Sequence, residues 1–175
     1  MLRWFRFESP AGGGEVAVPG KAGFTPLRPT YLPAGFQTMA VGFNPEAASL
    51  SYWNSTTQQV LLIDQTLIGT NQKAQLPTGK RVKVQGVPAV FVSGIQREMA
   101  FIQLPPTPEA MGPEKGSIEP ITSTTERITV KDGKSLIWLT NGIRFEVFSN
   151  LPEEEILKVA ESLKPAEEIP GTTAK

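Results

Sequence analysis

The chain has 175 residues, enough for one ordinary domain with its own core, and it carries 17 basic and 17 acidic residues. Because this balance leaves no overall field to hold a polyanion, nucleic-acid binding is disfavoured. The absence of histidine and cysteine removes Ser-His-Asp and Cys-His catalysis, CxxC redox pairs and the usual zinc and haem ligands.

The first thirty residues are rich in glycine and proline. Gly12-Gly13-Gly14 lacks the Lys-Ser/Thr of a phosphate loop and indicates a linker. Residues 1–30 are therefore predicted to be a flexible lead-in with at most short edge strands. No stretch reaches the roughly 20 apolar residues of a membrane span, so we expect membrane association only through an anchor that this chain does not contain.

From Tyr31 onward, apolar residues alternate with polar ones as in β-strands. The continuous apolar run from Val60 to Ile63 is typical of a strand covered on both faces. In residues 81–84 two basic side chains alternate with two valines, which predicts one solvated face and one core face. Gln85-Gly86 then fits a two-residue hairpin turn.

A meander is predicted between Glu126 and Phe148. Asp132-Gly133 and Asn141-Gly142 both accept the positive φ of a type I′ turn, so each is expected to close a tight hairpin. The second hairpin should carry an apolar column on one face. Its register pairs Thr140 with Ile143, Trp138 with Phe145, and Leu136 with Val147.

A helix is predicted after the meander. Asn150 reads as its N-cap, and Pro152 and three glutamates occupy the first turn, where the helix dipole favours acids. Lys164-Pro165 supplies the stop, and residues 166–175 are a polar tail. The buried face should consist of Ile156, Val159, Ala160 and Leu163.

Together these elements predict an α+β fold: a curved antiparallel sheet, built as a meander of hairpins, covered by one C-terminal amphipathic helix. Residues 31–165 would form this single domain. A proline-rich insertion at residues 104–120 interrupts it. The insertion is either a stiff loop or an extended recognition segment, because its prolines cannot donate to a sheet.

Carboxylates and a Ser-Lys pair are the remaining candidates for catalysis. Asp132 is accounted for by its turn, and Asp64 ends an apolar strand, where solvation or a turn cap is preferred over an acid of raised pKa. Lys134 and Ser135 are strand neighbours that point to opposite faces and cannot share a proton. We therefore expect no enzyme activity, no cofactor and no metal site.

Two adjacent aromatic residues suggest a binding surface. Because Tyr52 and Trp53 must face opposite sides of a strand, at least one needs cover beyond the first layer. A hydrophobic ligand groove lined by Tyr52, Trp53, Trp138 and Phe145, a partner surface or simple core packing would each supply it. The candidate ligand or partner surface comprises Tyr52, Trp53, Pro105, Pro106, Pro108 and Met111.

The order of motifs from Phe24 to Leu163 resembles a known family. The motifs are Tyr31-Leu32-Pro33-x-Gly35-Phe36, the aromatic-ended strand 50–53, the hairpin 83–89, Leu136-Ile137-Trp138 and the glutamate-rich helix. They are similar to a bacterial domain-of-unknown-function family found as the extracytoplasmic part of anti-sigma-factor-like and lipoprotein-carrier-like proteins. The resemblance implies an extracytoplasmic location and brings no catalytic residue.

Two functions follow as expectations. The first is a non-enzymatic sensory or protein-interaction domain of a membrane-associated regulator. The alternative is a carrier or binding protein for a lipid or another hydrophobic ligand. The identity of the partner or ligand is left open.

Overall fold

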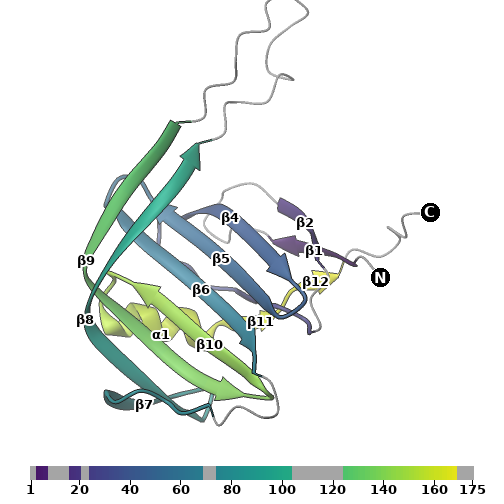
Figure 1. The fold of residues 1–175 in the computed structure, drawn as a ribbon, viewed down its shortest axis with the longest axis vertical. Coiled ribbons are helices and arrows are strands. Elements are labelled where there is room, and N and C mark those ends of the chain that lie inside the picture. The colour runs from purple at the N-terminus through teal and green to yellow at the C-terminus, as the bar shows by residue number, and fades with distance from the viewer. Residues whose placement is uncertain (1–2, 8–15, 21–23, 69–73, 104–123, 169–175) are drawn as a thin grey trace, which may run out of the picture.

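The computed structural model describes residues 3–7, 16–20, 24–68, 74–103 and 124–168 (Figure 1). A seven-stranded antiparallel sheet runs in the order β4-β5-β6-β10-β9-β8-β7. Its strands are β4 (Gln37–Asn44), β5 (Ala47–Asn54), β6 (Gln59–Leu67), β7 (Lys80–Val84), β8 (Val87–Gln103), β9 (Thr124–Thr140) and β10 (Ile143–Ser149).

One helix, α1 (Glu153–Glu161), covers one face of this curved sheet (Figure 1). We call this face the helix face. The predicted buried face is confirmed for Ile156, Val159 and Ala160. They pack with strand side chains such as Leu50, Ile63, Leu136 and Trp138. The expected α+β class, a curved antiparallel sheet with a single C-terminal helix, is therefore confirmed. The predicted stop at Lys164-Pro165 is wrong, because α1 ends at Glu161 and Leu163, though buried, begins the short strand Leu163–Pro165.

The hairpin between β9 and β10 has the predicted turn and register. Asn141 and Gly142 have φ values of 51° and 74°, the left-handed values that a type I′ turn requires. Trp138 lies opposite Phe145 and Leu136 lies opposite Val147. The Gln85-Gly86 turn between β7 and β8 also has positive φ at both residues.

Short strands occur within both segments that flank the predicted domain. β1 (Arg3–Phe7) pairs with β2 (Val16–Gly20) and with β12 (Glu167–Glu168). β3 (Leu27–Pro29) pairs with β11 (Leu163–Pro165), which follows the helix. Antiparallel pairing therefore joins the N-terminal strands β1 and β3 to the C-terminal strands β12 and β11.

The predicted hairpin turn at Asp132-Gly133 is wrong. Both residues lie inside the single 17-residue strand β9. Asp132 has a φ of 55°, but Gly133 is not left-handed, so the pair does not reverse the chain. The register against β8 shifts here, from Ile95 opposite Gly133 to Arg97 opposite Val130, which is a β-bulge.

Asn150 is not the N-cap of α1, contrary to the prediction. The residue before the helix is Pro152, and no side chain caps the first turn. Asn150 instead accepts a hydrogen bond from the backbone N–H of Val60 (3.1 Å) through Oδ1 and donates one to the carbonyl of Gln58 (3.4 Å). It therefore ties the end of β10 to the start of β6.

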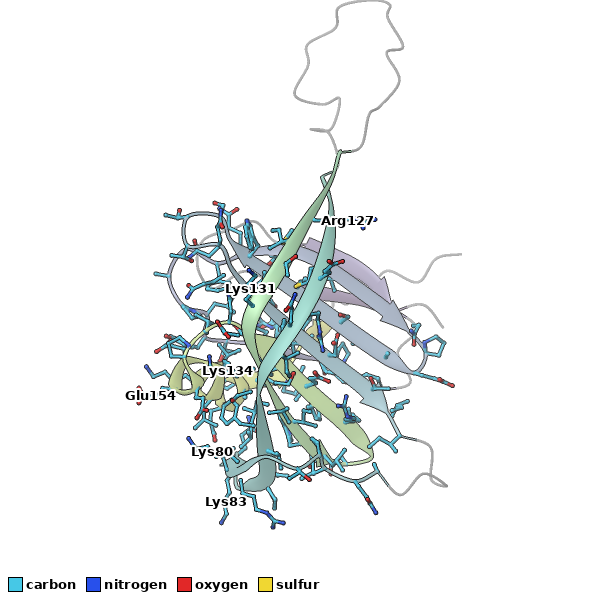
Figure 2. The ribbon with its side chains drawn as sticks, turned by 60° about the vertical axis from the view of Figure 1, so that its left-hand side comes forward. Lys80, Lys83, Arg127, Lys131, Lys134 and Glu154 are labelled. Carbon is cyan, nitrogen blue, oxygen red and sulfur yellow. The ribbon has the colours of Figure 1, made fainter. Side chains whose placement is uncertain are left out.

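Beyond the bulge, β8 and β9 extend past the ends of the neighbouring strands β7 and β10. Residues 95–103 and 124–133 pair with each other, while β7 ends opposite Phe91 and β10 ends opposite Lys134. We call this two-stranded extension the arm. It bends to the face opposite α1, where Val130 packs against Val60 and Phe148 in a second, smaller apolar cluster (Figure 2).

Candidate functional site: an apolar pocket at the hairpin turns

A pocket of about 270 Å³ lies where the turns of the β7–β8 and β9–β10 hairpins meet the segment 24–27. We call it the turn-end pocket. Its rim is polar and includes Thr25, Gln85, Thr140 and Asn141. Its floor and walls are apolar and include Leu27, Val84, Val87, Trp138, Ile143 and Phe145.

The floor of the pocket is an aromatic pair. The rings of Trp138 and Phe145 are stacked, with centroids 5.1 Å apart and planes inclined by 8°. Both are buried, with 4% and 2% of their surface exposed. The pair follows directly from the hairpin register, which sets the two residues opposite each other on the helix face.

One wall is held in place by a buried amide. Gln65 is fully buried, and its Oε1 accepts a hydrogen bond from the N–H of Leu27 (2.7 Å). Its Nε2 donates to the carbonyl of the same residue (2.7 Å). The carbonyl of Pro26 accepts a further bond from the N–H of Ala166 (2.8 Å). The segment 24–27 therefore has a fixed position over the end of the sheet.

A second part of the rim is tied to the helix. The backbone N–H of Gln85 donates to Oε1 of Glu161 (2.9 Å). Its side-chain Nε2 donates to the carbonyls of Glu161 (3.1 Å) and Leu163 (3.2 Å). These bonds satisfy carbonyls at the end of α1 and fix the β7–β8 turn. The pocket is accordingly preformed rather than built from free loops.

Gln65 was not singled out by sequence reasoning, although a signal was present. Leu61 and Ile63 alternate toward the core, and the same alternation sets Gln65 at a core position. A polar side chain there requires a buried hydrogen-bond partner. The identity of that partner, Leu27, lies 38 residues away and could not be read from the pattern.

Two of the predicted surface residues, Tyr52 and Trp53, lie on opposite faces of β5. Tyr52 is buried in the core on the helix face, where burial raises the pKa of its hydroxyl. Trp53 is half-buried on the opposite face and packs in the cluster under the arm. The proline-rich insertion, with Pro105, Pro106, Pro108 and Met111, lies outside the described residues.

Glu146, on the face opposite α1, accepts side-chain hydrogen bonds from β8, β9 and β10. Its Oε1 accepts hydrogen bonds from Ser135 Oγ (2.7 Å) and from Arg97 (3.2 Å), and its Oε2 accepts one from Arg144 (3.0 Å). Burial raises the pKa of Glu146, but the Ser135 hydrogen bond and the two guanidinium groups outweigh it and lower the pKa overall. Both oxygens of this carboxylate thus accept hydrogen bonds, and the bond from Arg97 joins the arm to the sheet.

Asp64 lies opposite Glu146 across the β6–β10 pair. Its Oδ1 accepts a hydrogen bond from Ser49 Oγ (2.6 Å) on β5. Within the part of the chain that the structure describes, no three acidic side chains gather as metal ligands would. No helix among these residues is long and apolar enough to cross a membrane.

Comparison with known families gives one match, over residues 115–163. The match is to a domain of unknown function (DUF4367). It includes β9, β10 and α1, the elements that supply Trp138 and Phe145. The resemblance to a domain-of-unknown-function family is thereby supported for this part of the chain. Neither the curated proteins nor the solved structures contain a match.

Proposed function

We propose that this chain is a non-enzymatic protein-interaction domain of an extracytoplasmic, membrane-associated regulator, and that the turn-end pocket receives an apolar side chain of the partner. The observation that carries the proposal is the stacked Trp138–Phe145 floor beneath a preformed pocket with a polar rim. Apolar pockets with a few polar groups at the rim are the usual form of binding sites. Buried apolar anchors dominate the energy of protein interfaces.

The size of the pocket favours a side chain over a whole lipid. Its volume is about 270 Å³. Pockets that enclose drug-sized ligands start at about 300 Å³ and extend to about 1,000 Å³. The rest of the helix face is filled by core side chains, including Ile156 and Val159 from α1. A long acyl chain would therefore have to leave most of its length outside.

The carrier alternative has one observation in its favour. The pocket floor belongs to the same apolar cluster as the core beneath α1, so a chain that displaced the segment 24–27 would meet mainly apolar surface, together with the amide of Gln65. A carrier of this kind should retain a lipid through purification. Native mass spectrometry of the protein from its own host tests this: a bound lipid mass would support the carrier, and an empty protein the interaction domain.

The experiment for the leading proposal fills the pocket. Val87→Phe adds a ring to the pocket wall, and Val92→Phe is the matched control, a half-buried valine of the same strand on the opposite face. A displayed random-peptide library is selected on the wild type and counter-selected on Val87→Phe. The expected peptides share one Leu, Phe or Trp anchor and bind Val92→Phe normally. Peptides without such an anchor, or with equal affinity for Val87→Phe, would contradict the proposal.

A further inference from the structure

The arm presents a free strand edge in a fixed position. Residues 124–133 of β9 pair with β8 on one side, and β10 has already ended opposite Lys134. Among the described residues, no backbone hydrogen bond from outside the hairpin reaches the arm. Figure 1 shows β9 on the outer side of the arm, with β8 between it and the remaining strands. Its outer edge is therefore unpaired within the part of the chain that the structure describes.

The arm is held against the sheet rather than left to swing. Val130 is 2% exposed and packs on Val60 and Phe148. Arg97 lies over the Phe148 ring at 4.2 Å and also donates to Glu146 (3.2 Å). Because a two-stranded ribbon alone is marginally stable in water, these contacts explain why the arm keeps a regular ladder. An edge that is already ordered loses little entropy when another strand pairs with it.

Two of the three outward side chains at residues 127–131 of this edge are cationic. Arg127, Thr129 and Lys131 alternate with inward-facing residues and are all exposed. Figure 2 shows both cations along the arm. Glu98 lies opposite Thr129 on β8, and no ion pair joins it to either cation among the described residues.

Charged residues on an edge select what can pair with it. They oppose the addition of a basic strand, and of a second copy centred on Thr129, since Arg127 would then face Lys131 of the other copy. An acidic strand would meet opposite charges at the same positions. The edge thus discriminates by charge while the backbone supplies the hydrogen bonds.

We propose that the β9 edge of the arm is a second interaction surface, which takes an extended acidic peptide segment of a partner protein as an added antiparallel strand. The segment carries acidic residues opposite Arg127 and Lys131 and a neutral residue opposite Thr129. This inference does not depend on the turn-end pocket, which lies at the hairpin turns at the other ends of β8 and β9.

The test uses the peptide acetyl-Val-Glu-Val-Thr-Val-Glu-Val-amide, fluorescently labelled, with fluorescence anisotropy as the readout. The full chain should bind it, and the double variant R127E/K131E should bind it at least tenfold more weakly. A peptide with lysine in place of glutamate should show the reverse preference. The control K83E changes an exposed cation of β7 outside the arm and should leave binding unchanged. Absence of binding to the wild type, or equal loss in K83E, would overturn the proposal.

Two N-methylated peptides separate strand addition from simple charge attraction. Alternate N–H groups of a strand point to the same edge, so methylation of one alternate set blocks the ladder and methylation of the other does not. Strand addition predicts that one of the two peptides loses binding and the other retains it. Retention by both would show that charge alone attracts the peptide, and would contradict the inference. The V87F variant, which fills the turn-end pocket, should bind the acidic peptide as the wild type does. Binding at the arm can then fail or succeed independently of the pocket.

Discussion

Trp138 and Phe145 face each other across the β9–β10 hairpin with their rings stacked 5.1 Å apart, and together they form both core and pocket floor. Truncation of Trp138 should therefore be costly. We expect Trp138→Ala to lower the free energy of unfolding by about 3–5 kcal/mol, as large-to-small core substitutions do. Denaturant titration measures this, and a loss below about 1 kcal/mol would contradict a buried role for the indole.

The buried amide of Gln65 should contribute through the groups it satisfies. Gln65→Leu leaves the N–H and carbonyl of Leu27 without their partner, and each unsatisfied buried group costs about 1–3 kcal/mol. Faster amide exchange is expected at Leu27 together with a lower unfolding midpoint. Gln75→Leu, at an exposed position, is the control and should change neither. Unchanged exchange at Leu27 would show that other contacts hold this wall.

The bend of the arm depends on the missing side chain of Gly133. A Cβ there would lie 2.5 Å from Cε2 of Phe148 and 2.8 Å from the carbonyl oxygen of Ile95. Gly133→Ala should thus cost about 1–3 kcal/mol, as overpacking does. Gly42→Ala is the matched control, because a Cβ at Gly42 meets no atom within 4 Å. Equal stability of the two variants would mean that the arm does not rest on Phe148.

Glu146 should make the stability of the arm depend on pH. Its pKa in the folded protein lies below the ordinary value, so its contribution is present above the unfolded-state pKa and is lost as the pH falls through the folded-state pKa. Glu146→Gln should therefore reduce the acid sensitivity of the unfolding midpoint, followed in urea from about pH 7 to about pH 3. Glu98→Gln, an exposed glutamate of the arm, serves as control. An unchanged pH profile for Glu146→Gln would refute this role.

A turn could be predicted from the sequence where the local residues alone determine the backbone conformation. Asn141-Gly142 closes a hairpin as its sequence indicates, and the register of Trp138 and Phe145 follows from it. Asp132-Gly133 carries the same signal, yet it marks a bulge within β9. A residue that accepts positive φ suits a bulge as well as a turn. The choice depends on pairing with β8, which local sequence does not reveal.

The candidate site was predictable in part. Alternation correctly separated Tyr52 from Trp53 and required cover for one of them, and the structure supplies that cover through the arm. Trp138 and Phe145 were among the aromatic residues considered for a groove, and they form the pocket floor. The rest of the turn-end pocket was not predicted, because its wall depends on the contact of Gln65 with Leu27. The prediction of Asn150 as the helix N-cap failed because a distant contact decides its role. Its partners, Val60 and Gln58, are about ninety residues away in the chain.

The most direct test of the central claim is an NMR titration that follows the indole N–H of Trp138 and the methyl groups of Ile143 with N-acetyl-leucinamide. An apolar side chain that enters the turn-end pocket must lie against the ring of Trp138, so both signals should shift with saturation. N-acetyl-asparaginamide should leave them unchanged, and Val87→Phe should abolish the response to the leucine compound. Shifts confined to other residues, or an undiminished response in Val87→Phe, would contradict the assignment of this pocket as the site for a partner's apolar anchor.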